Sequence, residues 1–342
     1  MSRYIWLIIS AWILCFAPAR LAAQPAPTPK KLSATEQLVL EQDIKRGIDN
    51  IYNFEFEKAD AIFGEFIRRD PKSPVGPFFL GMVLWWKIML DIENTTHDDA
   101  FIKQMDDVVE LCDERLERNS QDVEALFFKG GAMGFRGRLR ANRGSWIKAA
   151  GDGKDALPIV ERCKKLDSKN YDVLFGVGLY NYYAEAIPEK NPVLKPLVLL
   201  FPKGDKKKGI EMLELVSEKG KYAQTESLYF LLQIYYIYEH DYTKAVFYAK
   251  KLYEKYPANS FFYRYLGRAY AASGFWKDAD VIFREVLTKC QQHAPYYNEY
   301  VEREARYYVA MSLMNDHKST EALEHFKLAD KLCMKVDRAD GS

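Results

Sequence analysis

The chain has 342 residues, of which 48% are hydrophobic and 28% are charged, and its formal net charge is +1. This composition is ordinary for a globular protein and excludes the disordered, collagen-like and disulfide-scaffold classes. A chain this close to neutral lacks the basic surplus of proteins that bind nucleic acid, so nucleic acid is not predicted as a partner.

The N-terminus differs from the rest of the chain. Arg3 precedes a strongly apolar run from Ile5 to Ala17, and the small-residue stretch Leu21-Ala-Ala23 follows it. This order is typical of a cleaved secretory signal, and the run is too short for a membrane helix of about 20 residues. We predict a signal peptide over residues 1–23, cleaved after Ala23, with an uncleaved anchor as the alternative. The mature protein is then exported.

Helical signals begin after a Pro-rich spacer over residues 24–32. Ser33-Ala-Thr-Glu36 has the form of a capping box, which predicts a helix start. Helix pairs are expected to follow, and three glycines fall where the first helix of a pair needs a small residue: Gly47, Gly81 and Gly178. In the second pair, whose first helix carries Gly81, the second helix is predicted over residues 100–118.

Later units follow the same plan. The third unit carries Ala156, Val160 and Cys163 on its second helix, and the second helix of the fourth unit is predicted over Gly209–Lys219. Residues 226–259 and 260–293 form the most regular units, and a last helix pair follows. The tail over residues 336–342 is polar and is expected to fray. We count about seven helix pairs and expect almost no strand.

One motif identifies the repeat. Tyr263-x-x-Leu266-Gly267-x-x-Tyr270 is followed by Ala279-x-x-x-Phe283, and Ala245 lies 34 residues before Ala279. The pattern resembles the tetratricopeptide repeat, a 34-residue helix-turn-helix unit. The resemblance implies an all-α, right-handed superhelical solenoid over residues 33–335, because single repeats must stack to bury their apolar faces.

The same resemblance has functional implications. Tetratricopeptide solenoids are interaction scaffolds without intrinsic catalysis, so a protein or peptide is the predicted partner. The region from Phe175 to Gly209 is also similar to uncharacterised exported bacterial repeat proteins. That similarity implies the periplasm of a Gram-negative bacterium as the location, with secretion as the alternative.

A basic insertion interrupts the third unit. Residues 134–148 hold five cations, no acid and one Trp. Helical spacing places Arg136, Arg140 and Arg143 on one side and Arg138 away from them. With Trp146, these arginines form a candidate site for an acidic partner, since guanidinium forks bind carboxylates. The alternative is that they pair with acids such as Asp152, Asp155 and Glu161 and brace a long helix. We favour this structural alternative.

A Pro-rich insertion interrupts the fourth unit. Residues 187–205 contain four prolines, which prevent one long helix, while Val193 to Phe201 is nearly all apolar. We expect this stretch to tuck into the solenoid. The alternative is an exposed lip that contacts a membrane or a partner, with lysines beside it.

The groove lined by the first helices is apolar through its middle, which is why a cover is expected. Its predicted lining includes Phe78, Trp85, Trp86, Phe175, Tyr182 and Phe230. Arg264 and Arg268, one helical turn apart, form the best groove-facing polar pair. They resemble the basic pairs with which some tetratricopeptide proteins hold a carboxylate.

Catalytic and metal-binding motifs are not found in the sequence. None of the five histidines falls in His-Glu-x-x-His, and there is no phosphate-binding loop and no nucleophile elbow. We therefore predict no catalytic residue, no metal and no cofactor, and interpret the chain as an exported scaffold. The alternatives are a membrane-surface module using residues 193–201 and a self-assembling structural protein.

Overall fold

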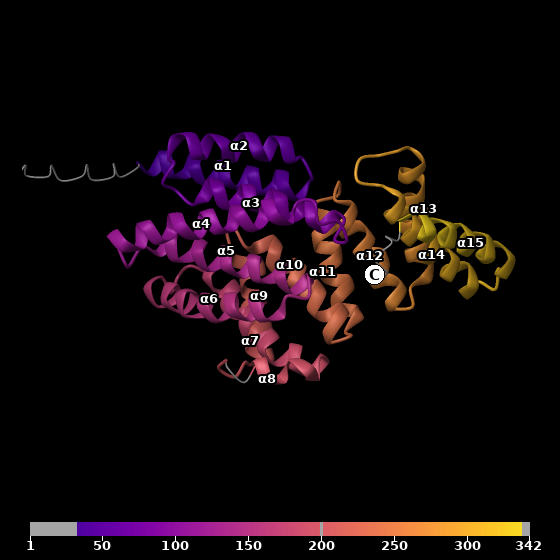
Figure 1. The fold of residues 1–342 in the computed structure, drawn as a ribbon. Helices are drawn as coiled ribbons and strands as arrows, with labels where there is room; N and C mark the ends of the chain where they lie inside the picture. The colour runs from indigo at the N-terminus through magenta and orange to yellow at the C-terminus, as the bar shows by residue number, and fades with distance from the viewer. Residues whose placement is uncertain (1–32, 199–200, 337–342) are drawn as a thin grey trace, which may run out of the picture. The chain divides into compact units, whose positions relative to one another are not determined.

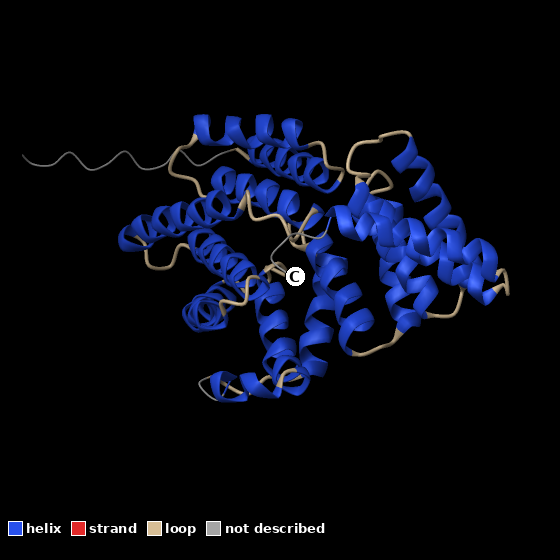
Figure 2. Ribbon diagram, turned by 45° about the vertical axis from the view of Figure 1, so that its right-hand side comes forward, coloured by secondary structure: helices blue, strands red, loops and turns tan. Residues whose placement is uncertain are grey.

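A computed structural model describes residues 33–198 and 201–336, and every regular element within them is helical (Figures 1 and 2). Contacts divide the chain into two compact units, Met1–Leu40 and Glu41–Ser342. Of the first unit the structure describes residues 33–40, the first turns of α1. The predicted signal peptide, the Pro-rich spacer and all but the first residue of the predicted tail lie outside the described residues.

The helices follow one another through short connections, which places consecutive helices antiparallel. Their bounds are α1 Ala34–Tyr52, α2 Phe56–Arg69, α3 Val75–Leu90, α4 Asp98–Arg118, α5 Val123–Asn142, α6 Trp146–Leu166, α7 Val173–Lys190, η1 Pro192–Leu194, α8 Lys195–Val198, α9 Lys206–Lys219, α10 Gln224–Gln233, η2 Ile234–Tyr238, α11 Tyr242–Lys255, α12 Ser260–Ala272, α13 Trp276–Gln291, α14 Glu299–Asn315 and α15 Ser319–Val336. Of these, η1 is a 3₁₀ helix and η2 is a π-helical turn that continues α10.

The first helix starts where the capping box predicts. The Ser33 backbone N–H donates to Glu36 Oε2 at 2.7 Å, and the Glu36 N–H donates to Ser33 Oγ at 3.2 Å. These two bonds satisfy donors that a helix start otherwise leaves free. The predicted start is confirmed.

Glycines let the two helices of a pair approach closely. A Cβ atom added at Gly267 of α12 would lie 2.8 Å from the Phe283 ring of α13, and one at Gly130 of α5 would lie 2.7 Å from Val160 of α6. The glycines at three other first helices meet second-helix atoms in the same way: Gly47 meets Phe63, Gly81 meets Met105, and Gly178 meets Leu213. The small residue of each repeat therefore seats a larger side chain of its partner helix.

The basic insertion lengthens two helices and forms no separate loop. α5 has 20 residues and α6 has 21, and they meet at a turn in which Gly144 has a φ of +71°. A positive φ favours glycine because a side chain would be strained there. The extra residues of the third unit thus extend one helical hairpin.

The Pro-rich insertion behaves differently from the expectation. α7 continues through Pro188 to Lys190, and the chain then forms η1 and α8. Val193 is 88% exposed, so the expected burial in the solenoid is wrong for this residue, whereas Leu194 and Phe201 are partly buried. Residues 199–200, in the same stretch, lie outside the described residues. Another group of side chains already occupies the place the insertion was expected to fill.

Aromatic side chains from distant helices fill the inner side of the first helices. Trp86 of α3 is fully buried, and its ring lies 5.3 Å from Tyr52 of α1, 5.8 Å from Tyr229 of α10 and 5.4 Å from Phe262 of α12. Asn259, at the start of α12, donates to the Tyr52 carbonyl at 2.6 Å. The apolar middle of the predicted groove is therefore protein core.

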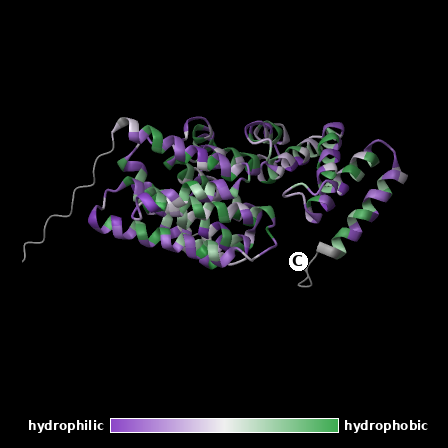
Figure 3. Cartoon of the chain, turned by 90° about the horizontal axis from the view of Figure 1, so that it is seen from above, coloured by the Kyte–Doolittle hydropathy of each residue, from purple (hydrophilic) through white to green (hydrophobic). Residues whose placement is uncertain are grey.

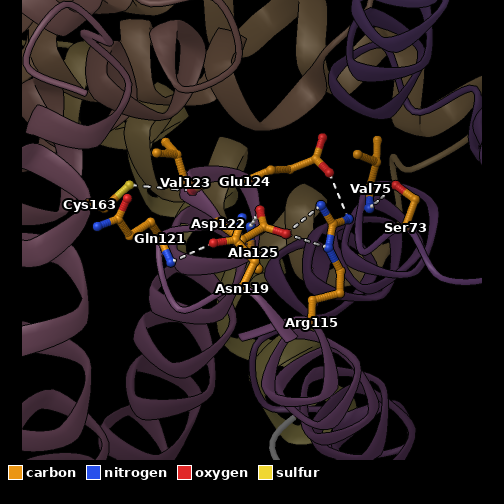
Figure 4. Close-up of polar contacts among 10 residues, drawn as sticks. All are labelled: Ser73, Val75, Arg115, Asn119, Gln121, Asp122, Val123, Glu124, Ala125 and Cys163. Carbon is orange, nitrogen blue, oxygen red and sulfur yellow. Dashed lines mark hydrogen bonds and ion pairs between the residues drawn. The ribbon is translucent and has the colours of Figure 1, made fainter. Parts of the chain in front are cut away.

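Polar contacts secure the turn between α4 and α5. At the α4–α5 turn, Arg115 Nε donates to Asp122 Oδ2 at 2.9 Å and its Nη1 donates to Glu124 at 2.8 Å, while Asp122 also caps α5 (Figure 4). The hydropathy colouring in Figure 3 mixes polar and apolar residues along the helices, as amphipathic helices require.

Candidate functional site: an arginine pocket

The arginines of the basic insertion pair with acids on neighbouring helices. Arg136 donates to Asp152 Oδ1 on α6 from Nε and Nη2, at 3.0 and 2.6 Å, and also contacts Asp106 on α4. Arg140 Nη1 donates to Asp152 Oδ2 at 2.6 Å. Asp152 is only 4% exposed, so one buried carboxylate holds two guanidinium groups. This arrangement matches the bracing alternative, with Asp152 as the partner.

Arg143 and Trp146 lie beyond that cluster. Arg143 Nε donates to Asp98 Oδ2 at 2.6 Å, and its Nη1 donates to the Ile92 carbonyl. Asp98 raises the Arg143 pKa through this hydrogen bond. Trp146 is the first residue of α6 and is 41% exposed. Their role in binding a partner stays a prediction.

Arg264 and Arg268 of α12 also share one carboxylate, but this carboxylate lies on the first helix of another pair and not on a second helix. Arg264 Nη1 donates to Glu304 Oε2 at 2.7 Å, and Arg268 Nε donates to Glu304 Oε1. Glu304 lies on α14, the first helix of the next pair. Burial works to raise the Glu304 pKa, but the charges of Arg264 and Arg268 outweigh it and hold that pKa below its usual value.

These two arginines line a pocket of about 300 Å³, which we call the arginine pocket. The described residues that line it are Met89, Leu90, Ile92, Arg138, Asn142, Tyr229, Gln233, Phe261, Arg264, Tyr265, Arg268 and Tyr300. Three of them are arginines, and none of these described residues is acidic. The pocket combines cationic groups with aromatic and aliphatic walls.

Arg138 enters the pocket from α5 and faces away from the other arginines of the insertion. Its guanidinium carbon lies 4.8 Å from the Trp85 ring centre and 4.3 Å from that of Phe230, so aromatic faces stabilise its charge. Its Nη1 lies 4.0 Å from Glu226 Oε2, which is too far for a hydrogen bond.

Glu226 is the buried acid behind Arg138. Its Oε1 accepts hydrogen bonds from Tyr52 Oη at 2.9 Å and from Trp86 Nε1 at 3.2 Å, whereas its Oε2 has no hydrogen-bond partner. Burial raises the Glu226 pKa, and Arg138 opposes that shift only in part. Glu226 therefore compensates the charge of Arg138 less well than Glu304 compensates that of its two arginines.

Several buried donors on residues of the pocket lining have no hydrogen-bond partner. They are Arg138 Nη1, Gln233 Nε2 and Arg264 Nε. A buried donor without an acceptor carries a desolvation penalty of about 1–3 kcal/mol. The three guanidinium groups on the lining suit the site to an anion. Within the described residues, no group of three or more His, Cys, Asp or Glu side chains is placed so that it could hold a metal ion.

The structure divides the residues predicted from sequence into two groups. It brings Arg264 and Arg268 together at the arginine pocket. It places Arg136 and Arg140 of α5, and Arg143 at the C-terminal end of that helix, in ion pairs outside the pocket, and Trp146 lies outside it at the start of α6. Sequence reasoning missed Arg138 as a pocket residue, along with Gln233 and Glu304. A signal for Arg138 was present, because it shares a helical face with the buried Phe135 and Leu139.

Across residues 33–198 and 201–336, no helix combines the length and apolar character that crossing a membrane requires.

The four cysteines within the described residues, Cys112, Cys163, Cys290 and Cys333, are free thiols. Burial raises the pKa of the Cys112 thiol to about 12, which keeps it unreactive at neutral pH.

No protein-family model matches this chain, and no curated protein matches it. Among solved structures it is similar to MamA from AMB-1, with 20% identity over 62% of this chain and 95% of that one and a TM-score of 0.37. It is also similar to yeast Tom70, with 11% identity over 87% of this chain and 70% of that one and a TM-score of 0.41.

A third similar structure is the C-terminal part of a TPR repeat-containing protein from Cytophaga hutchinsonii. The identity is 16% over 86% of this chain and 96% of that one, and the TM-score is 0.39. Similarities with TM-scores below 0.5 support no argument about fold or function. The fold assignment therefore rests on this chain's own 34-residue register and glycine contacts. On that evidence the chain is an all-α, tetratricopeptide-like solenoid.

Proposed function

We propose that this chain is a non-catalytic scaffold of the cell envelope that holds a protein partner by an acidic side chain. The observation that carries the proposal is the arginine pocket, where three arginines and no acidic residue make up the charged part of the described lining. A carboxylate accepts hydrogen bonds from guanidinium groups in a paired geometry that neutral groups cannot match.

The filled inner side limits how a partner can bind. Trp86, Tyr229 and Phe262 occupy the middle of the first-helix surface, so an extended peptide has no continuous groove there. A partner would instead dock on the rim and insert one acidic group. Export to the periplasm is supported by the N-terminal apolar run between Ile5 and Ala17.

Affinity capture from an envelope extract of the native host tests the proposal. The mature chain, residues 24–342, is compared with the double variant Arg138→Gln, Arg268→Gln. Arg118→Gln serves as the matched control, since that arginine is 60% exposed on α4. We expect a partner that the wild type and the control retain and the double variant loses, with all three folded by circular dichroism. A partner retained equally by all three would contradict the proposed site.

The exposed part of the Pro-rich insertion favours a second candidate function at a membrane surface. Val193 is 88% exposed, and lysines exposed on α8, α9 and the segment between them follow it: Lys195, Lys203, Lys207 and Lys208. Apolar and cationic side chains together suit an anionic bilayer. Flotation with anionic vesicles should then carry the protein upward, and Val193→Asp should weaken this; a protein that stays at the bottom rules the candidate out.

Self-assembly is a third candidate, favoured by the last helix. Leu323, Leu328 and Met334 of α15 are 51%, 43% and 76% exposed. Apolar groups exposed at the end of a solenoid suit contact with another chain. Light scattering at high protein concentration should show a dimer or larger species, and a monomer would remove this candidate.

A further inference from the structure

The arginine pocket has a polar side and an apolar side. The polar side carries Arg138 and Asn142 from α5, Gln233 from α10, and Arg264 and Arg268 from α12. The apolar side is formed by aliphatic residues at and just after the end of α3, and by aromatic rings of α10, α12 and α14. A ligand complementary to both sides has one charged end and one apolar body.

The charge of that end follows from the groups on the lining. Arg138, Arg264 and Arg268 are donor-only cations, and Gln233 offers a further amide donor. Donor-only cations select a ligand that is acceptor-only, which is the property of an ionised carboxylate.

Compensation by the protein's own acids is incomplete. Arg264 and Arg268 share the single carboxylate of Glu304, and Arg138 lies 4.0 Å from Glu226. Three guanidinium groups therefore face two carboxylates, and burial raises the Glu226 pKa. One further negative charge would bring this cluster to neutrality.

The size of the pocket is compatible with a free small molecule. A volume of about 300 Å³ is at the lower limit of small-molecule sites. Behind it lies the buried aromatic cluster around Trp86, and Phe261 of the lining packs against the Trp86 ring. A pocket of this volume suits a compact molecule.

We propose that the arginine pocket binds a free small carboxylate with an aromatic or aliphatic body. Its carboxylate would accept from Arg138, Gln233 and Arg264, and its body would lie against Phe261 and Tyr265. The proposal uses the pocket to which a partner's acidic side chain is assigned but goes beyond partner capture, because the ligand is a free molecule. Such a ligand would compete with the partner for the same donors.

Isothermal titration calorimetry of the mature chain with phenylacetate tests this inference. Three other probes separate the contributions: phenylacetamide has the body without the charge, acetate has the charge without the body, and inorganic phosphate is a different anion. We expect phenylacetate to bind at least about tenfold more tightly than each of the three, since charged and apolar contacts both contribute. Equal binding of acetate or phosphate would overturn the apolar-body requirement, and no heat with phenylacetate would overturn the inference.

Two variants locate the binding in the pocket. Arg268→Gln removes a charge and should weaken phenylacetate binding about tenfold, whereas Gln233→Leu removes one neutral donor and should weaken it about threefold. Arg118→Gln, outside the pocket, should bind like the wild type. If Gln233→Leu and Arg268→Gln are folded and bind like the control, the site is wrong. Failure of phenylacetate to bind leaves the capture experiment unaffected, so the two proposals fail separately.

Discussion

Helices α5 and α12 each carry two arginines one turn apart, and in each helix the pair shares a single carboxylate. In α5, Arg136 and Arg140 share Asp152, which lies on α6, the second helix of the same pair. In α12, Arg264 and Arg268 share Glu304, which lies on α14. The sequence spacing is the same, but the acids come from different positions in the repeat.

This difference in origin decides what each arginine pair can do. An acid on the second helix draws the arginines into the contact within one helical hairpin, and Asp106 supplies Arg136 with a second carboxylate. An acid on the next first helix holds its arginines on the inner side, where Arg138 adds a third cation. The arginine pair of α5 is therefore neutralised and structural. The arginine pair of α12 lines a site in which positive charges outnumber negative ones.

The largest expected effect tests the structural role of the α5 pair. Asp152→Ala leaves Arg136 and Arg140 in a partly buried position without their shared acid. Breaking a buried ion pair by removing one partner costs about 3–5 kcal/mol, and we expect about 3 kcal/mol because both arginines keep some exposure. Urea unfolding measures the loss.

Asp155→Ala, three residues away on the exposed side of α6, is the matched control and should change stability by less than about 0.5 kcal/mol. If Asp152→Ala were no more destabilising than this control, the α5 ion pairs would be solvated. The arginines of the insertion would then again be candidates for binding a partner.

A smaller effect compares the glycines of the same two helices. Gly267→Ala in α12 would place a methyl group 2.8 Å from the fully buried Phe283 ring, and we expect a loss of about 1–2 kcal/mol from overpacking. Gly134→Ala in α5 would meet no atom within 4 Å and should gain up to about 1 kcal/mol, since alanine favours helix.

Thermal unfolding of both variants tests whether Gly267→Ala lowers stability and Gly134→Ala raises it. A stabilising Gly267→Ala would mean that α12 and α13 are not held in the close contact described above. The position of α12 relative to the arginine pocket would then lose its explanation.

The same comparison shows how far the sequence alone leads. The helix pairs follow from local signals, namely the Ser33–Glu36 capping box and the register of Gly267 with Phe283, because each pair is closed by residues near in sequence. The pairing of Arg136 with Asp152 was likewise within reach, since only 16 residues separate them. These features could be predicted from periodicity and charge.

The arginine pocket could be predicted only in part. Arg264 and Arg268 were found by their spacing, but Glu304 comes from another repeat, and Arg138 meets Tyr229 and Phe230 from a helix more than 80 residues later. Such contacts depend on how tightly successive repeats turn, which no local pattern specifies. The same tight packing filled the predicted groove with Trp86 and its neighbours, so the Pro-rich insertion was not needed as a cover.

The smallest expected effect is a change in how stability depends on pH. It is expected for Glu304 and Glu226, the two acids beside the arginine pocket. The folded-state pKa of Glu304 is held below its usual value by Arg264 and Arg268, so its contribution to stability is present above the unfolded-state pKa and is lost as the pH falls. The folded-state pKa of Glu226 is raised by burial, so its ionisation lowers stability as the pH rises through the unfolded and folded values.

Replacing each acid by its amide should therefore change the acid side of the stability curve in opposite directions. Glu304→Gln removes a carboxylate whose protonation destabilises the fold, so the unfolding free energy should fall less between pH 7 and about pH 3 than in the wild type. Glu226→Gln removes a carboxylate whose protonation helps the fold, so the same fall should be steeper. Urea unfolding at a series of pH values measures both, and curves that move in the same direction would mean that Arg138 compensates Glu226 as fully as Arg264 and Arg268 compensate Glu304. In that case both acids would be ionised in the fold, and the three arginines of the inner side would exceed them by a single positive charge.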